Sequence, residues 1–294
     1  RPSSKAISIA QNRIKEKDFL GKCGVPVGQH IVIDSIKSIS NINEEHKIFP
    51  GILKTAQFGY DGKGQVHVNN IVELKNAFIS FNNVPCILEL KLELDLEFSI
   101  VLARSVNGEY LEYPLIENHH ESGILDFSLI PARVPFLLKK EATKLAMKIA
   151  NNLSYIGVMA VEFFISGNHL YVNEIAPRPH NSGHFSIDAC VYNQFNQQVL
   201  TLTGNKPKNE ETKFPISIML NLLGDLWFRS GKQREPNFKM ISGAGISLHL
   251  YKKAEPRIGR KMGHITILGS DNTEEGQVAL IEKAEAVRKI LWEN

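Results

Sequence analysis

Residues 172–184 read Val-Asn-Glu-Ile-Ala-Pro-Arg-Pro-His-Asn-Ser-Gly-His, and this stretch decides how the fold is interpreted. A carboxylate, Glu174, comes first, two prolines then bracket Arg178, and the run from His180 to His184 follows. Proline lacks an amide hydrogen and has a fixed φ, so this composition is unfavourable inside a helix or a strand. It predicts instead a shaped loop at the end of a strand, where polar side chains converge on a ligand.

The segment before this loop has the pattern of a β-hairpin. Residues 158–165 form an apolar run with one acid, Glu162, and the next four residues, Ser-Gly-Asn-His, indicate a turn. Each arm therefore carries one carboxylate, Glu162 or Glu174. Paired residues share a face of a sheet, and an even connection would pair Glu162 with Asn173 instead. For both acids to face the same side, the hairpin needs an odd connection or a bulge, which Gly167 permits.

The composition is that of an ordinary globular protein. The 294 residues are 43% hydrophobic and 22% charged, which allows a sizeable core and about two or three subdomains. The net charge of +3 is too weak to argue for nucleic acid or a membrane surface as a partner. The three cysteines are far apart and form no CxxC, which argues against disulfides or a cysteine zinc site and favours a cytoplasmic protein. No apolar run reaches the ~18 residues that span a bilayer.

A glycine-rich segment at residues 54–66 is a second candidate for ligand binding. Three glycines within six residues permit positive φ and a close approach of the backbone to a ligand. Consecutive amide hydrogens in such a loop can bind an anion, and Lys54 and Lys63 add positive charge. The spacing matches neither the P-loop nor GxGxxG. From these residues alone, a hairpin tip with an Asp-Gly turn is an equally good interpretation.

The N-terminal segment has the pattern of one helix. It begins at Ser3 or Ser4, where a hydroxyl can cap it, and it continues to about Lys22. Arg13 and Lys17 lie one turn apart on this helix and share a face. The residues alone favour a solvent-exposed face for this pair.

The rest of the chain alternates between strand and helix patterns. Strands are predicted at residues 31–33, 51–54, 86–89, 90–97, 98–104, 214–224, 245–251 and 263–268, and helices at 36–47, 139–153, 187–202 and 274–292. Within these strands, residues 90–97 alternate apolar and charged side chains with period 2. Residues 117–121, Glu-Asn-His-His-Glu, are rich in possible metal ligands but lack the HExxH spacing, and we interpret them as a loop without a metal. The loop 252–262 carries five cations and one acid.

Two carboxylates, a cationic glycine-rich loop and further cations together indicate a nucleotide and a hard cation. Magnesium takes oxygen ligands and is usually held by one or two carboxylates and by substrate phosphates. Glu162 and Glu174 are the candidates for those carboxylates.

The chain resembles the N5-carboxyaminoimidazole ribonucleotide synthetases, a family of ATP-grasp ligases. The resemblance runs nearly from end to end, and its most specific motifs are the loop from Glu174 to His184 and the run Gly259 to His264. The other matching residues are Pro2, Ser3, Ala6, Asn12, Arg13, Glu16, Lys17, Lys54, Gly59 to Gln65, Glu89, Glu97 to Ser99, Tyr113, Pro114, Glu117 and Asn118.

The resemblance implies an α/β (α+β) ATP-grasp fold with a small lid subdomain and a C-terminal β-rich subdomain. We expect a helical lead-in at 1–27, the lid at 28–98, the core with the metal and bicarbonate site at 99–235, and the C-terminal subdomain at 236–294. The family opens with a Rossmann-like domain, and we expect this sequence to begin just after it.

The resemblance also implies an activity, which is ATP-dependent carboxylation in purine biosynthesis. Bicarbonate would attack the γ-phosphate of ATP to give carboxyphosphate, and the exocyclic amine of 5-aminoimidazole ribonucleotide would capture the carboxyl group or the CO2 released from it. The products would be N5-carboxyaminoimidazole ribonucleotide, ADP and phosphate. The expected partners are ATP, bicarbonate, the ribonucleotide and a second copy of the chain in a homodimer, with Mg2+ or Mn2+ as the metal.

The matching motifs imply roles for individual residues. Glu162 and Glu174 would bind the metal, and Lys253 and Arg260 would hold the 5′-phosphate of the ribonucleotide. The ATP phosphates would contact Arg13, Lys54 and Lys63, and the adenine and ribose would contact Glu89 and Glu97 respectively. The carboxyl donor and the imidazole would be held by the catalytic set Arg178, His180, Asn181 and Tyr60, with Asp61 beside Tyr60 on the imidazole.

Three other interpretations remain open from the sequence. The chain is alternatively another ATP-grasp carboxylase or carboxylate–amine ligase, for which the grasp elements alone would suffice. A nucleotide-binding fragment without turnover is a second alternative. Nucleic-acid binding is the third and has little support, since it would need a stronger basic patch.

Overall fold

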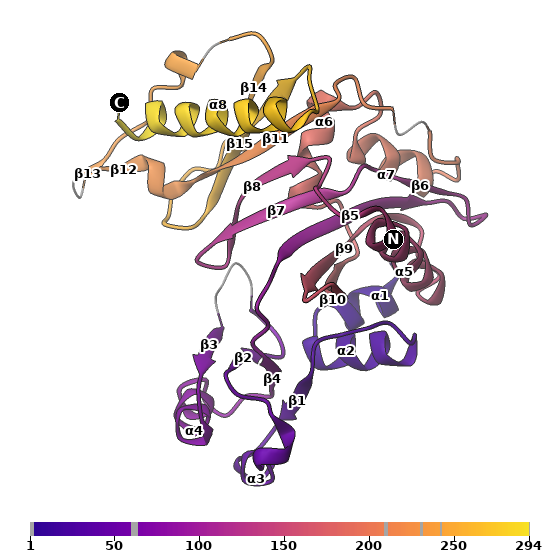
Figure 1. The fold of residues 1–294 in the computed structure, drawn as a ribbon, viewed down its shortest axis with the longest axis vertical. Helices are drawn as coiled ribbons and strands as arrows, with labels where there is room; N and C mark the ends of the chain where they lie inside the picture. Colours follow the sequence, from indigo (N-terminus) through magenta and orange to yellow (C-terminus); the bar gives the residue numbers. More distant parts are fainter. Residues whose placement is uncertain (1–2, 60–63, 209–210, 230–231, 242, 294) are drawn as a thin grey trace.

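Most of the strands belong to one large sheet in which the paired strands run antiparallel (Figure 1). The computed structural model describes residues 3–59, 64–208, 211–229, 232–241 and 243–293. The strand order is β10-β9-β5-β7-β8-β11-β15-β14, and β6 pairs with β5 outside this row. The strands are β5 (Leu96–Arg104), β6 (Tyr110–Glu112), β7 (Ile116–Glu121), β8 (Ile124–Ile130), β9 (Gly157–Ser166), β10 (His169–Ala176), β11 (Ile216–Leu223), β14 (Ile246–Leu250) and β15 (Lys261–Gly269).

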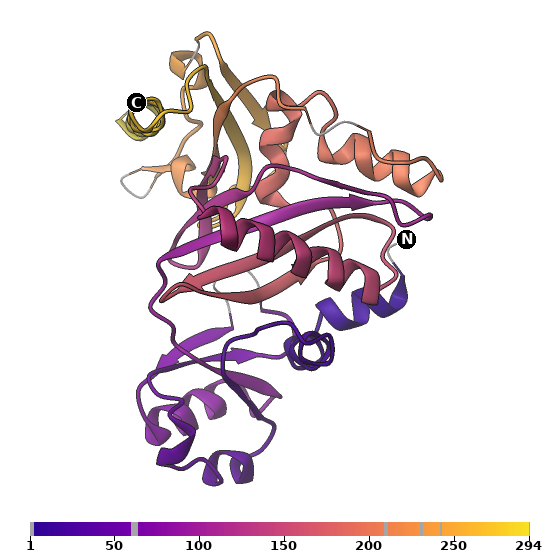
Figure 2. The ribbon, with the colours of Figure 1, turned by 45° about the vertical axis from the view of Figure 1, so that its right-hand side comes forward.

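A small lobe is built on a separate four-stranded sheet with the order β1-β4-β2-β3. Figures 1 and 2 show this lobe below the large sheet. It has a hydrophobic core of its own, which contains Leu53, Leu74, Phe78 and Leu88 and is separate from the cores of the large sheet. Its elements are β1 (His30–Ile33), α3 (Ile36–Ser40), a 3-10 turn (Glu44–His46), β2 (Gly51–Thr55), β3 (Gln65–Val68), α4 (Ile71–Ser80) and β4 (Cys86–Leu90).

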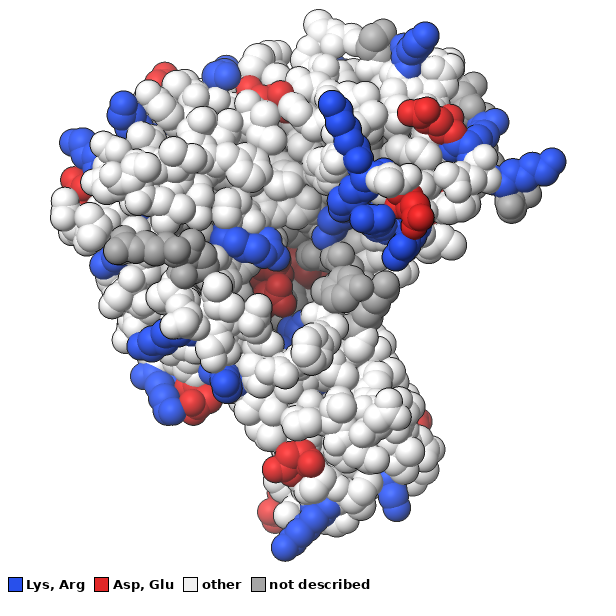
Figure 3. All heavy atoms as spheres, turned by 180° about the vertical axis from the view of Figure 1, so that it is seen from behind, with Lys and Arg blue, Asp and Glu red and all other residues white. Residues whose placement is uncertain are grey.

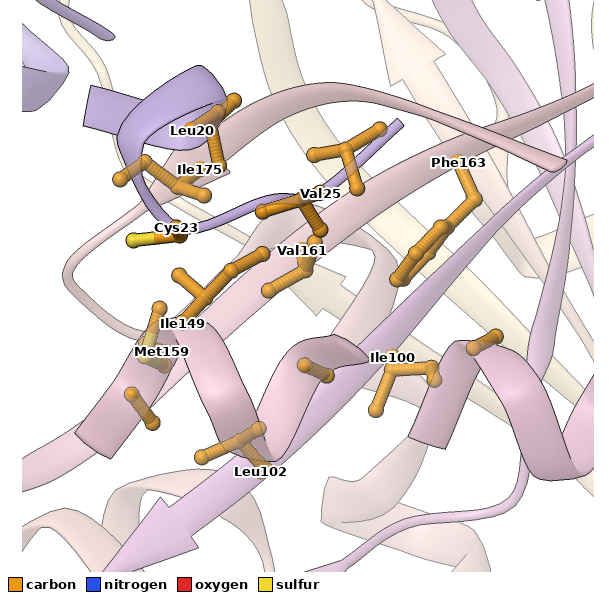
Figure 4. Packing of buried hydrophobic residues seen from close by; sticks show 14 of the residues in the cluster. Leu20, Cys23, Val25, Ile100, Leu102, Ile149, Met159, Val161, Phe163 and Ile175 are labelled. Atoms are coloured by element: carbon orange, nitrogen blue, oxygen red, sulfur yellow. The ribbon is translucent and has the colours of Figure 1, made fainter. Parts of the chain in front are cut away.

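Strand β9 is apolar on both faces because both of its faces are covered. Met159, Val161 and Phe163 pack in one cluster with α5 (Phe136–Asn152), which Figure 4 shows from close by. Val158 and Ala160 alternate with them and pack in the opposite cluster. The near-continuous apolar run of this strand follows from that double burial, because neither face meets water.

Helices close the remaining faces of the large sheet. The helices α1 (Ser4–Ala10) and α2 (Arg13–Lys22) join the cluster of α5, and Figure 4 shows Leu20 and Cys23 beside Ile175. The opposite face is covered by a 3-10 turn (Asn181–Phe185), α6 (Ser186–Ala189) and α7 (Gln194–Leu202). The C-terminal α8 (Glu274–Glu293) packs on β11 and β15.

The remaining short elements lie between β11 and β14. They are a 3-10 turn (Gly224–Trp227), the two-stranded ribbon of β12 (Phe228–Arg229) and β13 (Lys232–Gln233), and a second 3-10 turn (Phe238–Ile241). In the part of the chain that the structure describes, no helix has the length and apolar character to cross a membrane.

Several predicted elements are confirmed and others are wrong. The strands predicted at 31–33, 51–54 and 86–89 are present, as are the long helices α5 and α8. The predicted strand at 90–97 is wrong, because β4 ends at Leu90 and residues 91–95 carry the chain from the small sheet to the large one. The predicted loop at 117–121 is also wrong, because these residues form most of β7 and pair with β8.

Two predicted helices are each broken by an asparagine cap. The N-terminal helix divides at Asn12, whose side chain accepts hydrogen bonds from the backbone of Ile14 and Lys15. The helix predicted at 187–202 divides in the same way at Asn193, which caps α7. Asparagine favours this position because its side chain satisfies amide hydrogens that have no partner within the helix.

The domain boundaries stay predictions, although the sheets bear on them. The four-stranded sheet lies within the predicted lid segment 28–98. The strands of the segment 236–294, β14 and β15, extend the large sheet through β11 rather than forming a sheet of their own.

The core around β9 should depend strongly on Phe163. This ring is fully buried and stacks on Phe98 with centroids 5.1 Å apart. We expect Phe163→Ala to lower the free energy of unfolding by ~3–5 kcal/mol, because it leaves a large cavity. Phe136→Ala is the matched control, since that ring is 69% exposed. Urea unfolding followed by circular dichroism measures both, and equal effects in the two variants would contradict this view of the core.

Candidate active site

A β-bulge lies at the centre of the candidate site, where the two arms of the hairpin lose register. The turn is even, since Ser166 pairs with His169 across two residues. Farther along, Val172 pairs with Phe163, but Ile175 pairs with Val161. Two residues, 173 and 174, therefore lie opposite one, Glu162. The bulge that the sequence required is present, but it lies at these two residues and not at Gly167.

Side chains of α2 form hydrogen bonds with the backbone groups that the bulge leaves unpaired between the two strands. Lys17 Nζ donates to the carbonyl of Asn173 at 3.0 Å, and the amide of Ile175 donates to Glu16 Oε1 at 2.7 Å. Arg13 Nη1 lies 3.3 Å from Glu174 Oε2. The expectation of a solvent-exposed face is therefore wrong for Lys17, which is 4% exposed.

Glu16 is an unusual acid because it is buried beside another acid. Burial, and then the charge of Glu174, raise the pKa of Glu16 from 4.5 to about 8. The hydrogen bond from Ile175 and the nearby Lys17 and Arg13 oppose this rise only in part. At neutral pH the folded protein therefore holds Glu16 mostly in its neutral form.

Glu162 faces the loop that follows β10. Its Oε1 lies 3.2 Å from His180 Nε2, and Asn173 Nδ2 lies 3.4 Å from its Oε2. Burial raises the pKa of Glu162, but hydrogen bonding to His180 and the charge of that ring more than offset burial and lower the pKa to about 2. The carboxylate is therefore ionised at neutral pH, the form in which it can bind a cation.

A chain of buried hydrogen bonds fixes the other edge of the His180 ring. His180 Nδ1 lies 2.8 Å from Ser182 Oγ, which lies 2.8 Å from Ser99 Oγ. Asn118 Nδ2 donates to Ser99 Oγ at 3.0 Å and its Oδ1 accepts from Ser128 at 2.9 Å. This network joins the loop to β5, β7 and β8, and a satisfied buried network of this kind makes a site rigid.

Gln194, fully buried at the start of α7, holds the loop backbone in place. Its Oε1 accepts from the amide of His180 and its Nε2 donates to the carbonyl of the same residue, both at 2.8 Å. Its Nε2 also lies 2.8 Å from His184 Nδ1. A Cβ at Gly183 would lie 2.6 Å from Gln194 Oε1, so this contact requires glycine.

Glu89 and Lys54, both predicted to contact ATP, meet in the small lobe. Lys54 Nζ forms an ion pair with one Glu89 oxygen, and Lys17 Nζ lies 3.0 Å from the other. Burial raises the pKa of Glu89, but the charges of Lys54 and Lys17 lower it to about 2. The carboxylate of Glu89 thus links α2 to the sheet of the small lobe.

The remaining described acid of the predicted nucleotide site is Glu97 at the start of β5. Its Oε2 lies 2.9 Å from His120 Nδ1 on β7. Burial lowers the pKa of His120, but the hydrogen bond and charge of Glu97 raise it above its ordinary value. Viewed from behind, acidic atoms lie in a hollow between the small lobe and the large body, with lysine and arginine atoms around it (Figure 3).

The other predicted site residues are placed less closely together. Arg178 is exposed, and its Nη1 donates to the Pro179 carbonyl at 3.0 Å. Asn181 Nδ2 is buried and has no hydrogen-bond partner among the described residues. Lys253 and Arg260 donate to carbonyls of their own loop, those of Lys261 and Glu255, at 2.5 and 2.7 Å. Tyr60, Asp61 and Lys63 lie outside the described residues.

Comparison with known proteins gives two matching family profiles. The profile of the ATP-grasp domain matches residues 18–195, and that of the phosphoribosylaminoimidazole carboxylase C-terminal domain matches residues 217–277. The N5-carboxyaminoimidazole ribonucleotide synthase of Staphylococcus aureus strain COL is 39% identical over 284 residues, which cover 94% of this chain and 72% of that protein. The chain belongs to the N5-carboxyaminoimidazole ribonucleotide synthase family. The Bacillus subtilis member is 36% identical, covering 92% of this chain and 70% of its own length.

Solved structures of family members have the same fold. The Staphylococcus aureus N5-carboxyaminoimidazole synthetase complexed with ADP superposes with a TM-score of 0.83 at 35% identity, covering 99% of this chain and 74% of that one. The Aspergillus clavatus enzyme in complex with ADP and 5-aminoimidazole ribonucleotide gives a TM-score of 0.83 at 27% identity, covering 98% of this chain and 75% of that one. The predicted ATP-grasp fold is confirmed, as is the predicted family.

The residues around the bulge fit the magnesium ion that the sequence predicts. Glu162 is ionised, and the bulge brings Glu174 to the position opposite it, so the donor set consists of carboxylate oxygens. Hard dications prefer such ligands. Glu162 lies beside the His180 ring and Glu174 beside the Arg13 guanidinium, so each carboxylate already has a nitrogen partner within the protein.

Sequence reasoning missed four residues of this arrangement: Glu16, Lys17 as a buried group, His120 and Gln194. Lys17 had a signal, because it lies one turn after Arg13 on the same helical face. Glu16 and His120 had only their place within matching or ligand-rich motifs. Nothing in the sequence pointed to Gln194, since a single glutamine after a helix cap is also common at exposed positions.

The buried Glu16 predicts a pH-dependent loss of stability. A folded-state pKa of about 8 against 4.5 in the unfolded chain contributes stability that is complete below pH 4.5 and lost as pH rises through about 8. Glu16→Gln keeps an acceptor for Ile175 and removes the titration, so its stability relative to wild type should increase from pH 5 to pH 9. Chemical unfolding at both pH values measures this, with Glu141→Gln, an exposed position on α5, as the control. A pH-independent difference would contradict the assignment.

Proposed function

We propose that this chain carboxylates 5-aminoimidazole ribonucleotide with bicarbonate and ATP, giving N5-carboxyaminoimidazole ribonucleotide, ADP and phosphate. The family supports this reaction, since its named members are synthases of that product. One observation in this chain carries the proposal. The bulge brings Glu174 opposite Glu162, directly before the loop that holds Arg178, His180 and Asn181. The proposed cation site and the proposed anion site would thus adjoin each other at one strand end.

The proposed reaction has two steps. A bicarbonate oxygen attacks the γ-phosphorus of ATP, the bond to the β-phosphate oxygen breaks, and ADP leaves to give carboxyphosphate. The exocyclic amine of the ribonucleotide then forms a bond to the carboxyl carbon, directly or through released CO2. Inorganic phosphate leaves and the nitrogen loses a proton. The intermediate is multiply anionic, so fixed donors and cations around it stabilise the developing charge.

His180 is held in a fixed orientation within the loop that would hold the carboxyl donor. Its ring is fixed on one edge by Ser182 and on the other by Glu162, and its backbone is fixed by Gln194. Asn181 adds a buried amide nitrogen without a partner among the described residues, a donor ready for an oxyanion. Arg178, which is exposed, supplies a charge from the same loop.

The nucleotide would lie between the small lobe and the large sheet. Lys54, Arg13 and Lys63 would contact the phosphates, while Glu89 would contact the adenine and Glu97 the ribose. Glu162 and Glu174 would hold Mg2+ or Mn2+, which neutralises phosphate charge when bound. Tyr60 and Asp61 would contact the imidazole, and Lys253 and Arg260 the 5′-phosphate. We further propose that the chain acts in the cytoplasm as a homodimer.

Substrate dependence tests the reaction. The rate of ADP release should be increased by 5-aminoimidazole ribonucleotide in the presence of bicarbonate, and not by glycinamide ribonucleotide or biotin. Another ATP-grasp carboxylase or ligase would respond to one of the latter two. Bicarbonate-dependent ATP turnover that ignores 5-aminoimidazole ribonucleotide would rule out the proposal, and tight ADP binding without turnover would indicate a nucleotide-binding fragment.

The metal assignment predicts that Glu174→Gln lowers magnesium-dependent turnover by ~100-fold or more, because a bound metal supplies several kcal/mol to the transition state. The thermal unfolding profile should stay close to wild type, which shows that the fold is intact. Glu141→Gln, at an exposed position on α5, is the matched control. Near-normal turnover in Glu174→Gln would refute the assignment.

The phosphate contact predicts a selective effect of Lys253→Ala. KM for the ribonucleotide should rise ~10-fold or more, since a charge-assisted contact contributes ~1.5–3 kcal/mol, while KM for ATP changes little. Lys252→Ala removes the same charge from an exposed neighbour in the same loop and serves as the control. An unchanged KM for the ribonucleotide in Lys253→Ala would count against the contact.

A further inference from the structure

Two imidazoles and one carboxylate cluster between α6 and the C-terminal strands. Asp188 comes from α6, His249 from β14 and His264 from β15. One ligand atom from each of the three side chains lies within 4.8 Å of the other two. None of these residues has a role in the proposed carboxylation, so the cluster needs an explanation of its own.

Strand register brings this cluster together. His249 pairs with His264 across β14 and β15, and His264 pairs with Asn221 on β11. Directly paired residues share a face, so these side chains form a row across three adjacent strands. The two imidazoles stack with centroids 4.6 Å apart and an interplanar angle of 18°. Asp188 completes the cluster, with Oδ2 2.9 Å from His249 Nε2.

His264 carries a buried nitrogen without a partner. The residue is 1% exposed, and its Nδ1 lies 2.9 Å from the hydroxyl of Tyr251. Its Nε2 has no hydrogen-bond partner among the described residues, and neither has Oδ1 of the adjacent Asn221. Leaving a polar atom buried and unpaired costs free energy, and each such group in a folded protein calls for an explanation.

The surroundings of His264 are compatible with metal binding. A metal-bound histidine usually uses one ring nitrogen for the metal and engages the other in a hydrogen bond that orients the ring, as Tyr251 does here. Burial, and then the neighbouring His184 and His249, lower the pKa of His264 to about 3, which keeps the ring neutral. The neutral imidazole is the form that binds metals.

We propose that Asp188, His249 and His264 bind a divalent transition metal of the zinc class. Two imidazoles and a carboxylate suit Zn2+, whereas Mg2+ prefers oxygen ligands alone, so this site is distinct in chemistry from the one at Glu162 and Glu174. The ion replaces the hydrogen bond between Asp188 and His249 and takes up the free Nε2 of His264.

The position of the site gives it a structural consequence. Asp188 lies four residues after His184, the last residue of the loop that carries the candidate carboxyl-donor site. His249 and His264 lie on the strands that flank the loop of Lys253 and Arg260. A metal here fastens the two loops to each other through α6, β14 and β15.

Zinc titration of the full chain tests the proposal. After metal removal, Zn2+ is added in competition with a chromophoric chelator, with millimolar Mg2+ present to occupy carboxylate sites. We expect about one equivalent of Zn2+ to bind, with affinity reduced ~100-fold or more in His249→Ala and in Asp188→Asn. His67→Ala, which removes an exposed imidazole from the small lobe, should bind like wild type. Zinc should raise Tm in wild type and His67→Ala only.

Two results would overturn the proposal: no zinc binding by wild type, or equal affinity in wild type and His249→Ala. The second result would mean adventitious binding elsewhere on the chain. Substitution by Co2+ gives an independent readout, since visible absorption of the bound ion should disappear in His249→Ala while circular dichroism shows that the variant is folded. None of these experiments measures turnover, so their results do not bear on the carboxylation proposal.

Discussion

The candidate site depends on how helix α2 satisfies the bulge between β9 and β10. A bulge removes backbone groups from the ladder, and buried backbone groups must find other partners. Here the carbonyl of Asn173 is taken by Lys17 and the amide of Ile175 by Glu16. The bulge and the helix are therefore one structural unit. Without α2 the register shift would leave polar backbone unpaired, and without the shift Glu174 would not come opposite Glu162.

The same arrangement explains how a site for charged ligands is stable before they bind. Glu174 lies beside Arg13, Glu162 beside His180, and Glu89 beside Lys54 and Lys17. A buried charge without a partner is strongly destabilising, so each acid is paired within the protein. In the proposed reaction Glu162 and Glu174 would hold the metal, and Arg13 and Lys54 would contact the phosphates. Ligand binding would then replace one set of ion pairs by another and would leave no charge unpaired.

The sequence predicted what depends on local pattern. The hairpin, the long helices α5 and α8, and the family motifs were recognisable because periodicity and turn residues lie close together in the chain. The predictions were wrong where pairing between segments far apart in the sequence determines the secondary structure. Residues 91–95 alternate like a strand but cross between two sheets, while residues 117–121 look like a loop but are held between β5 and β8. The location of the bulge could not be predicted from the sequence either, because side chains of α2 form hydrogen bonds with its backbone groups.

Helix α2 shows why hydrophobic patterning failed at the centre of the site. Its buried residues are Glu16, Lys17 and Leu20, so the face that meets the sheet carries an acid and a base beside one leucine. A helix that packs on a regular strand buries apolar side chains, because the ladder already satisfies the backbone. One that packs on a bulge must bring a donor and an acceptor. In α2 the two buried polar side chains match an irregular strand opposite, and that irregularity brings Glu174 opposite Glu162.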